Sequence, residues 1–133
     1  MRILGLDIGD KRIGVAITDK SETIAKPLKV INNDDRVIDE LNNLIKDYNV
    51  KKMVVGIPYT LRGEIGLQAK KVTRFIDNVL RKSELKIIYI DERFTSKISR
   101  KIIKKNKRTG EIDKISASII LSDYLNSSKK QEE

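Results

Sequence analysis

The sequence contains no cysteine and no histidine. Without cysteine the chain can form no disulfide, no thiolate zinc site and no thiol nucleophile. Without histidine it can build neither a Ser-His-Asp triad nor a His-ligated metal site, and imidazole cannot serve as a general base. If the protein is an enzyme, its proton transfers must use Asp, Glu, Lys, Tyr or water. Any metal would be a hard cation held by oxygen, such as Mg²⁺ or Mn²⁺.

Long apolar runs are also missing from the sequence. No stretch approaches the roughly 20 residues that a membrane span needs, and Asp7 interrupts the apolar start before a signal-peptide hydrophobic region could form. We therefore expect a cytoplasmic protein with no membrane-spanning segment. The 133 residues, 39% of them hydrophobic, can bury a core. We predict a single domain over residues 1–126 and a frayed polar tail over residues 127–133.

Apolar periodicity and turn residues predict an alternating α/β chain. Strands are expected at 2–8, 12–18, 24–31, 52–57 and 86–90, and helices at 37–48, 64–81, 93–105 and 112–125, with a loop at 106–111. Three strands joined by short turns favour antiparallel pairing, and strands separated by helices favour parallel crossovers. The order β-β-β-α-β-α-β-α-α predicts a mixed five-stranded sheet with helices on both faces.

The net charge of +9, from 28 basic and 19 acidic residues, is concentrated in one segment. Residues 93–108 hold eight basic residues and no acidic one. These are Arg93, Lys97, Arg100, Lys101, Lys104, Lys105, Lys107 and Arg108. Such a block could be a solvated helix face, but its uniform sign favours a polyanionic partner, either a nucleic acid or an anionic membrane. Of these two partners we expect a nucleic acid and no membrane.

Three carboxylates from distant segments are candidates for a shared site. Asp7 interrupts an apolar strand, Glu92 follows the last predicted strand, and Asp113 opens the last helix. Each has an ordinary structural explanation, as a turn cap, a solvated strand end or a helix N-terminal charge. If the first strand is central, however, the three can meet at one edge of the sheet. Without histidine or cysteine, such a set fits a divalent-metal site that hydrolyses phosphodiesters.

The ordered motifs GLDIGDKRIGVAITD, VVGIPYTLRGEIGLQAKKVTRFI, IYIDERFTS and IDKISASIIL together resemble one protein family. They are similar to the YqgF family of pre-16S ribosomal RNA nucleases and Holliday-junction-resolvase-like proteins. The resemblance runs from about Arg2 to Leu125. It implies an RNase H-like fold, which agrees with the predicted order of elements.

The resemblance also implies roles for individual residues. Asp7, Glu92 and Asp113 match the family's metal-binding catalytic carboxylates. Arg93 and Thr95 match the rest of the Asp-Glu-Arg-x-Thr motif, and Lys11 and Arg12 match the turn after the first strand. Their implied roles are phosphate contact and support of the site. Together with the basic block, the expected nucleic-acid-binding residues are Lys11, Arg12, Arg93, Thr95, Lys97, Arg100, Lys101 and Lys104.

The sequence departs from the family pattern in a few places. Ser96 replaces a threonine, Ser116-Ala117 replaces a small alanine pair, and the loop at 59–62 lacks the usual polar, Asn-bearing composition. A fourth carboxylate, which well-studied junction resolvases carry in the last helix, is also missing at the expected place. Asp123 lies too many turns beyond Asp113 to replace it. These departures bear on substrate choice more than on the metal site, and they weaken the case for junction resolution.

Our main hypothesis is a metal-dependent endonuclease that acts on structured RNA, in the processing of the 16S ribosomal RNA precursor. One alternative is a Holliday junction resolvase acting on branched DNA. A second is a nucleic-acid-binding module without catalysis, and a third is a small nucleotide-phosphate enzyme built on the Asp7 to Gly9 turn. Known enzymes of that third kind duplicate the fold, for which 133 residues leave no room. One sequence identifies no dimer interface.

Overall fold

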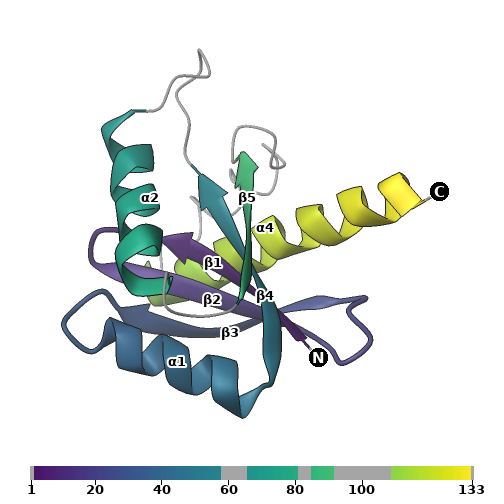
Figure 1. Cartoon of the computed structure of the whole chain (residues 1–133), viewed down its shortest axis with the longest axis horizontal. Helices are drawn as coiled ribbons and strands as arrows, with labels where there is room; N and C mark the ends of the chain where they lie inside the picture. The colour runs from purple at the N-terminus through teal and green to yellow at the C-terminus, as the bar shows by residue number, and fades with distance from the viewer. Residues whose placement is uncertain (1, 58–65, 81–84, 92–108, 133) are drawn as a thin grey trace.

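The computed structural model describes residues 2–57, 66–80, 85–91 and 109–132. Within these ranges it describes only the backbone of residues 67–69, 78–80, 91, 109–113 and 128–132. The chain forms a sheet with helices packed against it (Figure 1). The elements are β1 (Arg2–Ile8), β2 (Arg12–Thr18), β3 (Ala25–Asn32), α1 (Val37–Asp47), β4 (Val50–Ile57), α2 (Leu67–Leu80), β5 (Lys86–Asp91) and α4 (Thr109–Glu132).

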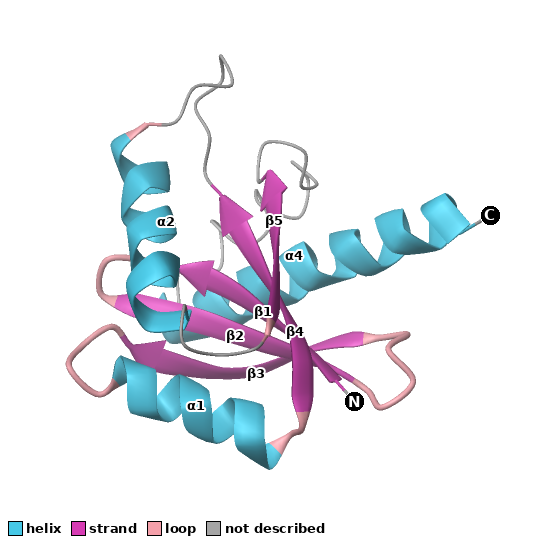
Figure 2. Cartoon of the chain, viewed as in Figure 1, coloured by secondary structure: helices cyan, strands magenta, loops and turns pink. Residues whose placement is uncertain are grey.

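The five strands form one mixed sheet in the order β3-β2-β1-β4-β5. β1 pairs antiparallel with β2, which pairs antiparallel with β3, while β4 lies parallel to both β1 and β5 (Figure 2). The predicted mixed five-stranded sheet is therefore confirmed. β1 lies at the centre, and its carboxyl end lies beside the turn to β2.

Two hydrophobic clusters lie on opposite faces of the sheet. Alternate strand residues point to opposite faces, so Leu4, Leu6 and Ile8 of β1 join the cluster that also contains α1 and α2 residues. Ile3 joins the cluster formed with α4. The central strands are covered on both faces, which explains why their sequences are almost continuously apolar.

Helix α4 approaches β1 very closely at Gly5. A Cβ atom on Gly5 would lie 2.8 Å from Leu121 Cβ and 3.0 Å from the Ala117 carbonyl oxygen. Ala117 and Leu121 are themselves fully buried. The missing side chain of Gly5 therefore sets how near α4 lies to the central strand.

Several predicted boundaries were wrong. β4 begins at Val50, α2 begins at Leu67, and α4 spans Thr109–Glu132 instead of 112–125. Part of the expected loop at 106–111 is thus helical, and residues 127–132, expected as a frayed tail, continue the helix. The apolar pattern marks only the part of α4 that packs on the sheet, whereas Lys, Gln and Glu also favour a helix in solvent. The helix predicted at 93–105 lies outside the described residues.

Candidate active site

Asp7 lies near the carboxyl end of the central strand, where it pairs with Gly14 of β2. It is the partly exposed position between the buried residues Leu6 and Ile8. The alternation that sends Ile3 and Gly5 toward α4 sends Asp7 to the same face of the sheet. A carboxylate held at this depth is costly without cations or strong donors nearby. Asp7 therefore stands where a strand-end ligand to a cation would be placed.

Two contacts fix how α4 lies along β1. Lys52, which pairs with Ile3 in the sheet, donates a hydrogen bond from Nζ to Tyr124 Oη at 3.2 Å. Farther along β1, Gly5 meets Leu121 and Ala117. Since higher residue numbers on α4 face lower ones on β1, the helix runs antiparallel to the strand.

The backbone position of Asp113 follows from this arrangement. Residue 113 precedes Ala117 by about one helical turn, a rise of about 6 Å. Asp7 follows Gly5 by two strand residues, about 6.6 Å. Moving from the Gly5 contact in this direction along both elements brings the backbone of residue 113 toward the strand end that carries Asp7.

The structure describes only part of the predicted carboxylate set. The Asp113 side chain lies outside the description, as does the whole of Glu92. Within the described ranges, no three acidic side chains lie close enough to hold a metal ion together. The shared site of Asp7, Glu92 and Asp113 thus stays a prediction. So do the predicted roles of Arg93, Thr95, Lys97, Arg100, Lys101 and Lys104, which also lie outside the described residues.

The β1–β2 turn places Lys11 and Arg12 close to Asp7 along the chain. Gly9 N–H donates to the Arg12 carbonyl oxygen at 2.9 Å, and a Cβ on Gly9 would lie 2.8 Å from that oxygen. Asn33 secures the turn from outside, because its Nδ2 donates to the Gly9 carbonyl and its backbone N–H to the Lys11 carbonyl, both at 2.9 Å. Lys11 is exposed and Arg12 is half-buried. These hydrogen bonds therefore fix the backbone of Lys11 and Arg12 at the carboxyl end of β1.

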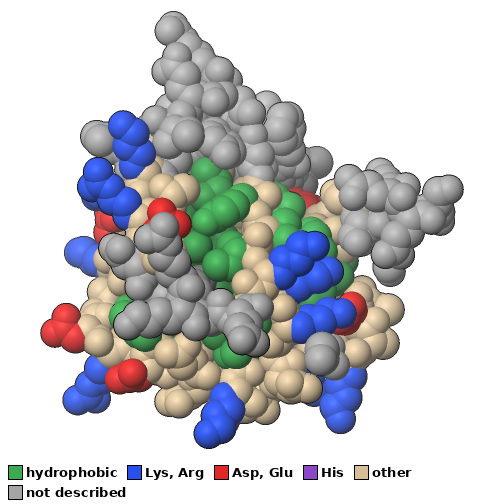
Figure 3. Space-filling view, viewed as in Figure 1, with side chains coloured by type: hydrophobic (Ala, Val, Ile, Leu, Met, Phe, Trp, Pro, Cys, Tyr) green, Lys and Arg blue, Asp and Glu red, His purple; other side chains and the backbone are tan. Residues whose placement is uncertain are grey.

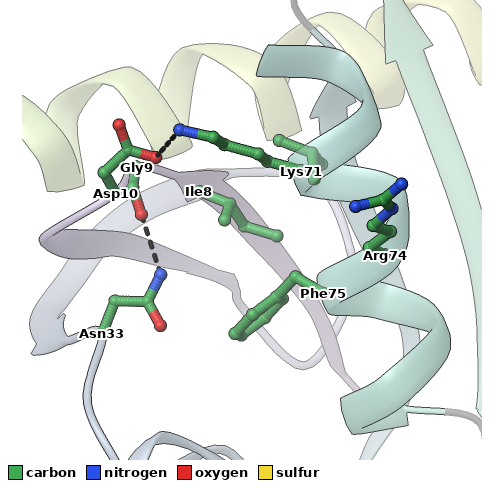
Figure 4. Close-up of a pocket in the computed structure, with 8 residues that line it drawn as sticks. Ile8, Gly9, Asp10, Asn33, Lys71, Arg74 and Phe75 are labelled. Carbon is green, nitrogen blue, oxygen red and sulfur yellow. Dashed lines mark hydrogen bonds and ion pairs between the residues drawn. The ribbon is translucent and has the colours of Figure 1, made fainter. Parts of the chain in front are cut away.

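A pocket that the sequence analysis did not anticipate lies beside this turn, on the opposite face of the sheet from α4. Its volume is about 270 Å³. The lining residues are Ile8, Gly9, Asp10, Asn33, Lys71, Val72, Arg74 and Phe75. Figure 4 shows Lys71 reaching from α2 to Asp10, whose Oδ1 lies 3.5 Å from Lys71 Nζ. The sequence placed Phe75 on the inner face of a helix but gave no sign of which strand end that face would meet.

No helix in the described part of the chain has both the length and the apolar character needed to cross a membrane.

The strand order, the antiparallel hairpins and the helices on both faces define an RNase H-like fold. The Thermus thermophilus RuvC structure in complex with a Holliday junction substrate has a TM-score of 0.66, with 10% sequence identity, over 97% of this chain and 96% of that one. Fowlpox virus resolvase, solved with Holliday junction DNA, has a TM-score of 0.60 and 20% identity, over 96% of this chain and 99% of that one. Both likenesses show that the fold is that of junction resolvases.

The sequence comparisons identify the family. Residues 1–127 match the family model described as "RuvX: Holliday junction resolvase". A Sulfurihydrogenibium protein named "Putative pre-16S rRNA nuclease" is 47% identical over 130 residues, covering 93% of this chain and 89% of that protein. A protein of the same name from Desulforudis audaxviator is 39% identical over 97% of this chain and 96% of its own length. The chain belongs to this family of nucleases, and the resemblance noted in its motifs is confirmed.

Proposed function

We propose that this chain is a divalent-metal-dependent endonuclease that cleaves structured RNA, with the 16S ribosomal RNA precursor as its substrate. The observation that carries the proposal is the position of Asp7, a partly buried carboxylate at the end of the central strand. The names of the relatives support the choice of RNA. In this proposal residues 1–126 act as one nuclease domain, and processing of ribosomal RNA places the protein in the cytoplasm.

The residues present fit a hard cation. Asp7 offers carboxylate oxygens from a rigid strand, and the absence of histidine and cysteine leaves oxygen as the donor, which suits Mg²⁺ or Mn²⁺. Asp7 and Asp113 would hold the ion directly, and Glu92 would complete the site or orient the attacking water. When bound, divalent ions at such a site activate water and stabilise the charge on the leaving oxygen.

The chain's cations would hold the nucleic acid beside these carboxylates. Lys11 lies in the turn that follows β1, and Arg12 opens β2, a few residues after Asp7 in the chain. Arg93, Thr95, Lys97, Arg100, Lys101 and Lys104 would extend the contact to backbone phosphates. Because phosphate contacts release counterions, binding should weaken steeply with salt.

The decisive experiment compares the parent protein with Asp7→Asn. This change removes the charge but keeps the size, so we expect RNA binding to persist while cleavage is lost by at least about 10³-fold, the order of magnitude of a removed transition-state stabiliser. A labelled precursor fragment would be incubated with Mg²⁺, Mn²⁺ or chelator, and products resolved on a gel. Equal cleavage by parent and variant would refute the role of Asp7.

Junction resolution is the second candidate, supported by the description of the matching family model. A four-way DNA junction in the same experiment separates the two candidates. Paired, symmetric cuts in the junction, with intact RNA, would favour resolution. If both substrates shift in a native gel yet stay intact in every metal, the protein is a binding module.

A further inference from the structure

We infer that the pocket between the β1–β2 turn and α2 holds one unpaired nucleotide of the substrate strand, next to the cleavage site. The inference rests on the proposed function and extends it to how the substrate is positioned. The pocket begins at Ile8, the residue that follows Asp7. Neighbouring strand residues point to opposite faces of the sheet. The pocket and the Asp7 side chain therefore lie on opposite faces, at the same end of β1.

The floor of the pocket suits the flat face of a base. Ile8 from β1 and Phe75 from α2 point toward each other across it (Figure 4). Phe75 lines the pocket and is only partly buried. Nucleobases stack on aromatic rings whatever their identity. The volume of about 270 Å³ lies just below the range of about 300–1,000 Å³ typical of small-molecule pockets, which suits one ring system.

The rim of the pocket suits a phosphate. Lys71 and Arg74 are exposed and lie about one turn apart on α2. Figure 3 shows basic side chains gathered over the upper part of this helix, beside exposed apolar surface. Lys71 is paired only loosely, since its Nζ lies 3.5 Å from Asp10 Oδ1 and both side chains are more than 60% exposed (63% and 61%). Its ammonium group can therefore turn toward a phosphate at little cost.

An apolar floor under a rim of two cations and one carboxylate, Asp10, matches an unstacked nucleotide better than a duplex. Proteins that recognise RNA bind bases splayed out of loops and single-stranded ends, stacking them on aromatic side chains. A base in this pocket would place the adjacent backbone at the edge where Asp7 lies. The pocket would thus set which phosphate reaches the carboxylates.

The test measures binding without cleavage. An RNA hairpin with a short single-stranded flank carries one 2-aminopurine, placed at each flank position in turn, and is titrated with protein in chelator. We expect the fluorescence to change on binding at one flank position. Phe75→Leu should abolish that change and weaken binding about tenfold, the size expected for base–aromatic stacking. Phe75→Tyr, which restores a stacking surface, should keep both. Melting temperatures establish that the variants are folded.

The cations are tested with exposed side chains whose loss leaves the core intact. Lys71→Gln with Arg74→Gln should lower the slope of log affinity against log salt by about 1.4, the value for two phosphate contacts on a single strand. The matched control is Lys29→Gln with Lys46→Gln, which removes the same charge from exposed sites on β3 and α1. Equal slopes for the two double variants would overturn the proposal.

Two other results would also overturn it. If the 2-aminopurine signal is the same in the parent and in Phe75→Leu, no base lies on Phe75. If AMP alone binds as tightly as the flanked hairpin, and if Phe75→Leu abolishes this AMP binding, the pocket binds a free nucleotide and not the substrate strand. Because the assay needs no cleavage, it stays readable if the proposed nuclease function fails. A nuclease that cleaves RNA without this pocket would show no position-specific signal.

Discussion

Gly5 controls the distance between α4 and the central strand, and replacing it with alanine tests this control. The new Cβ would lie 2.8 Å from Leu121 Cβ and 3.0 Å from the Ala117 carbonyl oxygen. Neither atom is the end of a flexible side chain, so α4 must move away from the sheet by several tenths of an ångström. Overpacking of this kind costs about 1–3 kcal/mol. Replacing glycine in a strand recovers about 0.5–1 kcal/mol of chain entropy.

We therefore expect Gly5→Ala to destabilise the fold by about 1–2 kcal/mol. For a chain of this size that corresponds to a fall in melting temperature of about 3–10 °C. The same displacement moves the α4 backbone that carries Asp113 relative to Asp7, the two residues proposed to hold the metal ion. If they do so, their misplacement lowers the rate, since a shift of about 1 Å in a catalytic group can cost 10²-fold. Cleavage at a temperature well below melting should thus fall more than the loss of folded protein explains.

Val54→Ala is the matched control for this prediction. Val54 pairs with Gly5 in the sheet and is buried in the same cluster against α4. Its truncation leaves a cavity, which destabilises the protein without pushing the helix outward. Thermal unfolding and RNA cleavage would be measured for both variants. An unchanged melting temperature for Gly5→Ala, or equal cleavage by both variants at equal folded fraction, would refute the reasoning.

Two further predictions concern the end of β2 and the turn that connects it to β3. Thr18 is buried, and its Oγ1 accepts a hydrogen bond from Ile3 N–H at 2.9 Å. Thr18→Val should therefore destabilise the protein by about 1–3 kcal/mol and speed amide exchange at Ile3. Unchanged exchange at Ile3 would argue against a stabilising role of this hydrogen bond. Hydrogen bonds from Thr23, above all, and from Ser21 lower the pKa of Asp19 below its ordinary 3.8. Stability from this carboxylate is therefore present above pH 3.8 and lost as pH falls toward the lowered pKa, so Asp19→Ala should show a shallower loss of stability in acid unfolding; identical acid unfolding curves would contradict this.

The order of elements could be predicted because it depends on local patterns. Alternation and turn residues marked β1, β2 and β5 closely, and the helical stripe that begins at Val37 marked α1. The ends of α2 and α4 could not be predicted in the same way. A pattern of apolar residues shows where a helix is covered, whereas its ends depend on capping and on solvent-exposed turns.

The candidate site was predictable only in part. Asp7 could be recognised because a charge inside an apolar strand is costly and calls for an explanation. The pocket could not, since Asn33, Lys71 and Phe75 belong to different elements, and no spacing in the sequence says that they meet. From its helical spacing in the sequence, Phe75 is predicted only as a core residue.

The sequence by itself determined the chemistry available to this protein. The absence of cysteine and histidine restricts any metal to oxygen ligands, and the ordered motifs carry the family. Only the tertiary structure decided which residues from distant parts of the chain meet. Gly5 lies against Leu121, and Ile8 and Phe75 line one pocket, although the members of each pair are far apart in the chain. Such contacts depend on the shapes of two packed surfaces, which local patterns do not encode.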